Sequence, residues 1–445
     1  PVMNNGRIKP LDTVARTSLR MMSHKTVALL PTQSSQGQTL VEHSAERWLM
    51  DLMARQPHST GYRIFRIDHP ALIGFLELQE RTGGDDRFLY SWSELEPKFT
   101  SIARQRAAAR ELESDQRNTF QRELLELTQK MELFAGLGNM LVPLVIPPEQ
   151  AVAGPPTDVP WISMAEVEGH DAATRPYDTI AHQTWQLLLN AWQQGDHQTF
   201  NRLTERYQAY LAEQMPQAAR RAAVEAAFNR YSPFYLASGL YVAAGVLSML
   251  GWLFAPKTLR ASGLWIMVLA FVIHGLSIAV RMYIQGRPPV TNLYSSAVFV
   301  GFGGVLLSIV LERYLRIGLG TVAGATIGFA SLVIAYNLGH DGDTLHQMQA
   351  VLDSNFWLST HVTSIVLGYS AMFVAGILGL VYLIFGLSTD LLTAERRRKL
   401  ATTIYGVICF ATLLSFVGTV LGGMWADQAW GRFWGWDPKE NGALL

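Results

Sequence analysis

The chain has a single cysteine, Cys409, and it lies inside an apolar run. A disulfide, a Cys-x-x-Cys redox pair and a zinc–thiolate site within the chain are therefore excluded. Charge is scarce and balanced: charged residues make up 16% of the sequence, with 36 basic and 36 acidic side chains. This balance indicates neither a nucleic-acid-binding surface nor a disordered acidic tail. An internal repeat and a phosphate-cradling glycine loop are also lacking.

Hydrophobic residues, in contrast, make up 49% of the chain and are concentrated in its second half. Up to about residue 230 the composition is that of an ordinary water-exposed domain, whereas from Ser232 onward apolar stretches of about twenty residues follow one another, the length that crosses a bilayer as a helix. We expect an all-α polytopic helical membrane protein, with a mainly helical extracytoplasmic domain over 1–232. The six expected membrane spans lie at about 233–254, 262–283, 294–312, 318–338, 357–387 and 401–422.

The basic residues of the short loops predict the orientation. Three loops that alternate to the same side carry Lys257 and Arg260, Arg313 and Arg316, and the cluster 396–399. The positive-inside rule puts that side in the cytoplasm. One opposing loop carries Arg281 and Arg287, so the asymmetry is incomplete. The alternation puts the first domain and residues 423–445 on the periplasmic side of a bacterial inner membrane.

Both ends of the sequence are abrupt. An exported domain needs a signal peptide or an upstream span, but neither precedes it, and the first residue is Pro1. Residues 441–445 resemble the first turn of another apolar span. We therefore expect an internal portion of a longer membrane protein, with further spans beyond both ends.

Within the first domain, the charged run 101–135 has amphipathic helical periodicity, and 177–230 contains helical patterns interrupted by Gly195 and Pro216. Residues 62–67 indicate a strand. The opening 5–16 is interpreted as a polar turn followed by a capped helix.

The most informative segment is 430–441, Trp-Gly-Arg-Phe-Trp-Gly-Trp-Asp-Pro-Lys-Glu-Asn, directly after the sixth apolar run. Its three tryptophans fall within seven residues and alternate with glycines, which permit close approach of a ligand. A bilayer anchor is the other interpretation, because interfacial tryptophan commonly plays that role. The spacing favours a platform for a large flat ligand.

This sequence pattern resembles the tryptophan-rich "WWD" signature of heme-handling cytochrome c assembly proteins. It is most similar to that of the CcsA/ResC branch, the system II cytochrome c synthetases. The resemblance covers 232–445, so that 423–445 corresponds to a truncated WWD segment. The 5–16 opening also resembles a segment of fused or extended versions of these proteins. The resemblance implies a cytochrome c heme lyase, catalytic only as part of the full-length protein or complex.

What the resemblance implies about partners is equally specific. Heme b is the substrate and ligand, held at the outer face and joined to the Cys-x-x-Cys-His motif of an apocytochrome c. A ResB-type partner or fused segment is implied as well. The thiol nucleophiles belong to the apocytochrome, so no catalytic residue is assigned in this chain. Partners are therefore heme, apocytochrome c and the lipid bilayer, without nucleic acid.

His361 is the expected axial ligand of the heme iron. It lies about one turn inside the fifth span, where an ionisable side chain is a functional candidate by default. The alternative is a neutral histidine hydrogen-bonded to a neighbouring helix. The resemblance matches His361 to the family's outer histidine before the tryptophan-rich motif. The family's second outer histidine, which follows the motif, is expected outside residues 1–445.

The remaining candidates for heme binding are Trp430, Trp434, Trp436, Asp437, Arg432, His274, Arg281 and Arg287. The tryptophans are expected against the porphyrin, and Asp437, with Glu440, is expected to order the loop. The arginines suit propionates, although arginine snorkelling to the interface explains Arg281 and Arg287 equally well. His274, past the middle of the second span, is either a helix-bridging structural histidine or a heme contact.

Two other classes remain open. One is a heme exporter or chaperone without ligase activity, and the other is a polytopic carrier of a different amphiphile.

Overall fold

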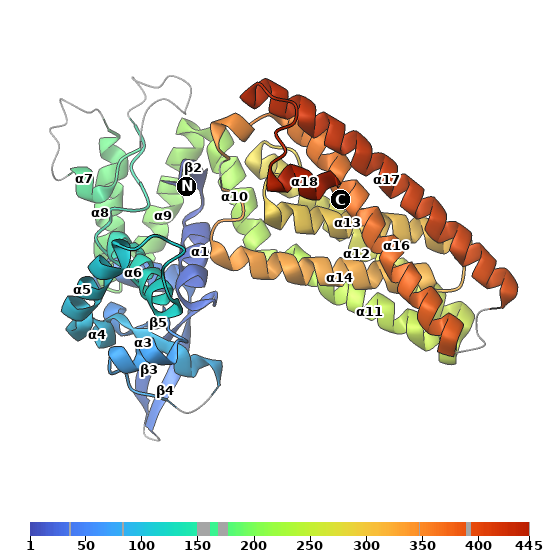
Figure 1. The fold of residues 1–445 in the computed structure, drawn as a ribbon. Coiled ribbons are helices and arrows are strands. Elements are labelled where there is room, and N and C mark those ends of the chain that lie inside the picture. The colour runs from blue at the N-terminus through green and yellow to red at the C-terminus, as the bar shows by residue number, and fades with distance from the viewer. Residues whose placement is uncertain are drawn as a thin grey trace. The chain divides into compact units, whose positions relative to one another are not determined.

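The computed structural model consists of two compact units (Figure 1). Unit 1 comprises Pro1–Ala227 with His340–Asp343, and unit 2 comprises Phe228–Gly339 with Thr344–Leu445. The described residues are 1–34, 37–81, 84–148, 161–167, 177–346, 348–388 and 393–444. Leu445, which belongs to the predicted first turn of a further apolar span, lies outside them.

Unit 1 begins with a hairpin of β1 (Val2–Asn4) and β2 (Arg7–Lys9). Its two turn residues, Asn5 and Gly6, both have positive φ, 50° and 74°, as the Asn-Gly pair of a tight hairpin requires. Helix α1 (Leu11–Ser23) follows directly, with Pro10 at its N-cap. The expected turn is therefore present, but the expected side-chain cap is absent from this described segment.

A four-stranded antiparallel sheet has the strand order β4-β3-β5-β6. The strands are β3 (Val27–Ser34), β4 (Gly37–Ser44), β5 (Arg63–Arg66) and β6 (Leu89–Ser91). The strand expected at 62–67 is β5, and the other three were not predicted. Its Ile64 and Phe65 are fully buried, which anchors the sheet in the core of unit 1.

Helices make up most of the rest of unit 1. The longer ones are α2 (Ala45–Met53), α5 (Phe99–Arg110), α6 (Thr119–Gly138), α8 (Thr179–Gln193), α9 (His197–Gln214) and α10 (Pro216–Tyr231). Shorter helices in the same unit are α3 (Pro70–Phe75), α4 (Trp92–Leu95) and α7 (Met164–Val167).

The run 101–135 is helical as expected, but it consists of two helices, because the chain breaks between α5 and α6. Asn118 caps α6: its side chain accepts from the Gln121 N–H at 2.9 Å, and Gln121 accepts from the Asn118 N–H at 3.0 Å. This reciprocal capping box starts a new helix at Thr119, although the charged residues are spread evenly along 101–135 and give no sign of a break.

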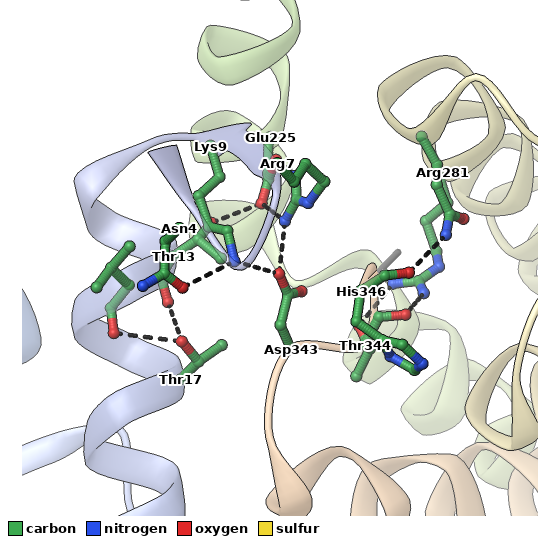
Figure 2. Close-up of polar contacts among 12 residues, drawn as sticks. Asn4, Arg7, Lys9, Thr13, Thr17, Glu225, Arg281, Asp343, Thr344 and His346 are labelled. Carbon is green, nitrogen blue, oxygen red and sulfur yellow. Dashed lines mark hydrogen bonds and ion pairs between the residues drawn. The ribbon is translucent and has the colours of Figure 1, made fainter. Parts of the chain in front are cut away.

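A buried ionic cluster joins distant parts of unit 1 (Figure 2). Arg7 donates to both oxygens of Glu225, at 2.5 and 2.9 Å, and to Asp343 at 2.9 Å. Lys9, only 1% exposed, donates to Asp343 at 2.6 Å. Burial alone raises the pKa of Asp343, but the charges of Arg7 and Lys9 outweigh it and hold that pKa well below its usual range. Two cations thus balance two carboxylates, which makes burial of all four tolerable.

Unit 2 contains the apolar helices. Within its described residues, together with the end of unit 1, six helices are long and apolar enough to cross a membrane, with mean hydropathies from 1.6 to 2.2. They comprise α11 (Pro233–Leu253, continuing from α10), α12 (Pro256–Gln285), α13 (Leu293–Leu315), α14 (Leu319–Leu338), α16 (Thr363–Ser388) and α17 (Ala394–Trp430). The predicted polytopic helical membrane fold is confirmed. A terminal helix, α18 (Pro438–Leu444), follows.

Two boundaries in unit 2 differ from expectation. The fifth span starts with α15 (Asn355–Trp357) and a π-helical turn, Leu358–Val362, before α16. The sixth does not end near residue 422 but continues to Trp430. Within unit 2, α16 packs along α17 and α13, and α13 packs along α14. Residues 423–430 are therefore part of a helix that packs beside α16 and beside the π-helical turn that carries His361.

Candidate functional site

His361 lies in the π-helical turn Leu358–Val362. Such turns displace the backbone hydrogen-bond pattern and occur frequently at functional sites. Its Nδ1 is 2.6 Å from the carbonyl oxygen of Gly418 on α17. Because a carbonyl only accepts, Nδ1 carries the proton, and the neutral ring keeps its lone pair on Nε2. Among the described residues, Nε2 has no hydrogen-bond partner.

The face of α17 that contacts His361 is formed by two glycines and one tryptophan. A Cβ atom placed on Gly422 would lie 2.6 Å from Cε1 of His361, so the imidazole rests directly on this glycine. The Trp425 ring meets the His361 ring at an angle of 63°, with centroids 5.9 Å apart. Gly418, Gly422 and Trp425 are spaced by four and three residues, so they share one face of the helix. Together they hold the imidazole in one orientation.

The tryptophan-rich segment starts where α17 ends. Gly431 has a left-handed conformation, with φ of 69°, and its N–H donates to the carbonyl of Asp427 at 2.8 Å. The chain then folds back, because the Phe433 ring packs on Gly423, where a Cβ would lie 2.7 Å from ring atoms. His361 and Phe433 therefore contact consecutive glycines of α17, which brings the histidine and the segment to the same end of the helix.

The Trp-Asp-Pro-Lys-Glu run is a helix start. The Asp437 carboxylate accepts from the Glu440 N–H at 2.8 Å and the Lys439 N–H at 2.9 Å, while Glu440 accepts from the Asp437 N–H at 3.2 Å. This is a capping box with Pro438 in the first turn of α18. Glu440 also accepts from the Gly435 N–H at 2.6 Å. The two acids thus fix the loop that carries the tryptophans.

The tryptophans leave much of their surface uncovered. Trp430 is 60% and Trp436 66% exposed, and the Trp434 and Trp436 rings meet edge to face at 6.2 Å. Trp436, directly before the capping box, has a positive φ of 58°, a strained conformation for a bulky residue. Arg432 lies beside them, more than half exposed, with its guanidinium 3.9 Å from Asp437. These side chains present apolar ring surface together with an available cation.

His274 is placed differently. Its ring is fully buried, with Nδ1 3.1 Å from the hydroxyl of Tyr241 on α11 and Nε2 3.1 Å from the carbonyl of Val298 on α13. The rings of Phe234 and Phe302 pack against it edge to face. Both nitrogens are therefore engaged in bridging helices, and neither is available to iron in this structure.

Arg281, near the end of α12 (Figure 2), and Arg287, in the loop after it, also have protein partners. Arg281, 7% exposed, donates to Oγ1 and the carbonyl of Thr344, at 3.0 and 2.9 Å, and lies over the Tyr294 ring. Arg287 forms a two-pronged ion pair with Asp353. Their observed contacts tie this loop to the segment leading into α15, rather than leaving the guanidinium groups open to a ligand.

In the described part of the chain, no three His, Cys, Asp or Glu side chains gather in a way that would hold a metal ion. A metal at His361 would thus depend on one protein ligand together with its own macrocycle. Cys409 lies exposed on α17, away from these contacts.

Sequence reasoning missed three residues of the site. Trp425, Gly418 and Gly422 were assigned to the end of the sixth span or to the segment after it. Their four- and three-residue spacing is a helical signal, readable once α17 is extended to Trp430. Trp357 was also missed as a contact: its Nε1 donates to Gln428 Oε1 at 2.7 Å and joins the start of the fifth span to the end of the sixth.

The fold and the site define a multi-pass helical membrane protein that carries an accessible imidazole beside an ordered tryptophan-rich loop. Residues 290–445 match the family described as cytochrome C assembly protein. The second half of the chain is accordingly similar to cytochrome c assembly proteins of the CcsA type.

Individual relatives show the same similarity. Protein NrfI of Wolinella succinogenes is 25% identical over 99% of this chain and 47% of its own length. The cytochrome c biogenesis protein CcsA of Guillardia theta is 28% identical over 40% of the chain and 66% of the relative. Its counterpart in Prochlorococcus marinus (strain NATL2A) is 29% identical over 37% and 62%. The chain thus spans about half of NrfI and less than two thirds of these CcsA proteins.

Proposed function

We propose that this chain holds heme at the outer face of the bacterial inner membrane and presents it for covalent attachment to apocytochrome c. The observation that carries the proposal is the state of His361: Nδ1 donates to Gly418, and Nε2 is without a partner among the described residues. Metal-binding histidines usually donate their second ring N–H in this way, which fixes the ring and increases the basicity of the ligating nitrogen.

The substrate in this proposal is heme b, with Nε2 of His361 as one axial ligand of its iron. The exposed rings of Trp430 and Trp436 and the half-buried ring of Trp434 supply surface for the porphyrin, and Arg432 supplies a cation for a propionate. Asp437 and Glu440 act on the loop backbone and keep these side chains in place. His274, Arg281 and Arg287 support the helices and loops around the site through their own hydrogen bonds.

Attachment needs no nucleophile from this chain. Each cysteine thiol of the apocytochrome adds across one heme vinyl group: a carbon–sulfur bond forms, and the thiol hydrogen passes to the other vinyl carbon. The addition is redox-neutral. The role of the chain is to hold the heme vinyl groups close to the cysteine thiols, so that a bimolecular reaction becomes effectively intramolecular.

The full-length protein, expressed with a Cys-x-x-Cys-His apocytochrome in a host that lacks its own maturation system, tests the proposal. We expect red purified protein and a cytochrome whose heme survives denaturing electrophoresis. Bound heme without thioether formation would identify a carrier instead of a ligase, and colourless protein would point to a different amphiphile.

The tryptophan platform predicts a specific loss. In the Trp434→Phe, Trp436→Phe double variant, interfacial hydrophobicity and insertion are retained, but the larger ring surface and the indole N–H groups are removed. We expect heme per protein to fall several-fold, on the order of the 1 kcal/mol that each aromatic contact contributes. Phe373→Leu, a change at an exposed aromatic ring of α16 outside the loop, serves as the control. Wild-type heme content in the double variant would support simple anchoring.

Orientation gives a second prediction. The basic residues Arg396, Arg397, Arg398 and Lys399 begin α17, and the tryptophan-rich loop follows its other end. The positive-inside rule predicts a periplasmic loop. A reporter active only in the periplasm should work when fused after Asn441 and fail when fused after Arg398. The reverse pattern would put the tryptophans in the cytoplasm and contradict the proposed site.

A further inference from the structure

Unit 2 has a second feature that the heme proposal does not use, a basic cavity at the opposite end of its helices from the tryptophan-rich loop. The cavity measures about 560 Å³ and lies between the start of α12 and the end of α13. It is lined by Lys257, Arg260, Ala261, Leu264, Glu312, Arg313 and Arg316. Four cations thus face one carboxylate.

The carboxylate of Glu312 is already occupied. Its oxygens accept from the backbone N–H groups of Gly318 and Gly320, each at 2.8 Å, and more weakly from Thr321 at 3.4 Å. Glu312 therefore caps the start of α14. Its negative charge still acts on Arg260, but four cationic side chains against one carboxylate leave the cavity an excess of positive charge.

Packing holds the aliphatic part of the Arg260 side chain in place. A Cβ on Gly251 would lie 2.9 Å from Arg260 Cγ, and one on Gly318 would lie 3.4 Å from its Cδ, so two glycines clasp the aliphatic stem. Its buried Nε has no hydrogen-bond partner in the described structure. A fixed guanidinium with a free donor is a preformed receptor for a phosphate or carboxylate, because little side-chain entropy remains to be lost on binding.

The start of α12 adds backbone donors. Its N-cap, Ala255, makes no side-chain cap, and Lys257 lies in the first turn. Pro256 has no N–H, so the backbone donors at this end of the helix begin with Lys257; they favour an anion, as does the helix dipole. The donors and the fixed Arg260 are on the same helix, one turn apart.

The surroundings identify the anion as a lipid headgroup. The cavity lies where membrane-spanning helices end, the depth at which lipid phosphates are found. Leu253, Phe254 and Tyr314, near these helix ends in the sequence, are 74%, 72% and 59% exposed, as expected for side chains in contact with acyl chains. The described lining includes no aromatic ring or histidine, so it offers heme neither stacking nor an iron ligand.

We propose that this cavity binds the headgroup of a dianionic phospholipid of the cardiolipin type, with Arg260 and Arg316 as its main phosphate contacts. Two phosphates match the excess of cationic side chains better than one. Arg316 ends α13 in a left-handed conformation, and its Nε donates to the Arg313 carbonyl at 3.2 Å, which orients a second guanidinium. Basic pockets between membrane helices are a recognised setting for such headgroups. The proposal does not depend on heme binding.

The test uses full-length protein, purified in mild detergent and delipidated, with cardiolipin binding followed by native mass spectrometry. We expect the affinity of the Arg260→Gln, Arg316→Gln variant for cardiolipin to fall about tenfold or further, since each basic residue contributes to headgroup attraction. The matched control, Arg396→Gln with Arg398→Gln, removes two charges elsewhere on unit 2 and should bind like the wild type. Millimolar inorganic phosphate should not displace the lipid.

Equal losses in the two variants would overturn the proposal, since attraction would then be unspecific. Displacement by inorganic phosphate would overturn it in favour of a soluble anion. If the first variant fails to fold, Lys257→Gln with Arg313→Gln makes the same test, because both side chains are exposed and their loss leaves the packed Arg260 stem intact. Full cardiolipin binding by that variant and by Arg260→Gln alone would contradict the assignment.

Discussion

Replacing His361 with alanine is expected to reduce the heme content of the purified full-length protein about tenfold or more, and to abolish its low-spin spectrum. The reason is direct. His361 is the one imidazole at the end of α17 whose Nε2 is unpartnered among the described residues, whereas His274 has both nitrogens occupied. Without it, the tryptophan loop retains ring surface but provides no bond to iron. The measurement is heme per protein together with the visible spectrum.

Two further variants make the His361 result specific. His197→Ala removes an exposed histidine of unit 1 and should leave heme content unchanged. Added imidazole should partly restore the low-spin spectrum of His361→Ala, because a small ligand can enter the space of the lost ring. An unchanged spectrum and unchanged cytochrome maturation in His361→Ala would exclude it as the iron ligand.

Local signals in the sequence were sufficient for the membrane fold. Each span is specified by about twenty consecutive apolar residues, and this property does not depend on distant contacts. His361 was recognised for a similar reason, since an ionisable group inside such a run is conspicuous. The sheet in unit 1 was less predictable. Only β5 has a clear strand signal, while β3 includes Pro31 and polar residues and is defined by its pairing with β4.

The end of the sixth span shows why the rest of the site was hidden. Gly422 and Gly423, followed by Asp427, look like the end of a membrane helix, because glycine is a weak helix former. The structure uses the same glycines for close packing: Gly422 receives His361 and Gly423 receives Phe433. Such a role depends on which residues of another segment approach, and a single sequence does not contain that information.

Arg281 and His274 illustrate the same limit. Both were candidates because a polar group in an apolar setting needs a partner. The partners are Thr344, Tyr241 and the Val298 carbonyl, which lie on other helices or loops. The need for a partner was visible in the sequence, but its identity was not. Either a bound heme or a neighbouring helix can supply the hydrogen-bond partner that such a polar group needs.

The close contact between Gly422 and His361 leads to the sharpest prediction. In Gly422→Ala, the new Cβ would lie 2.6 Å from Cε1 of the imidazole and 3.0 Å from Nδ1, so the ring must move away from α17. The hydrogen bond from Nδ1 to the Gly418 carbonyl would then be lost or distorted. We expect heme content to fall about tenfold, the usual effect of disturbing the group that orients a metal-binding histidine.

Gly406→Ala is the matched control on the same helix. A Cβ at Gly406 meets no atom within 4 Å, so this change adds helix propensity, up to about 1 kcal/mol, without a clash. Heme per protein and the thermal unfolding midpoint are measured for both variants. A fall in heme for Gly422→Ala, with unfolding close to that of the wild type and unchanged heme in Gly406→Ala, is the expected result. If both alanines retain wild-type heme, the orientation of His361 by α17 is unimportant for binding, and the imidazole acts without that support.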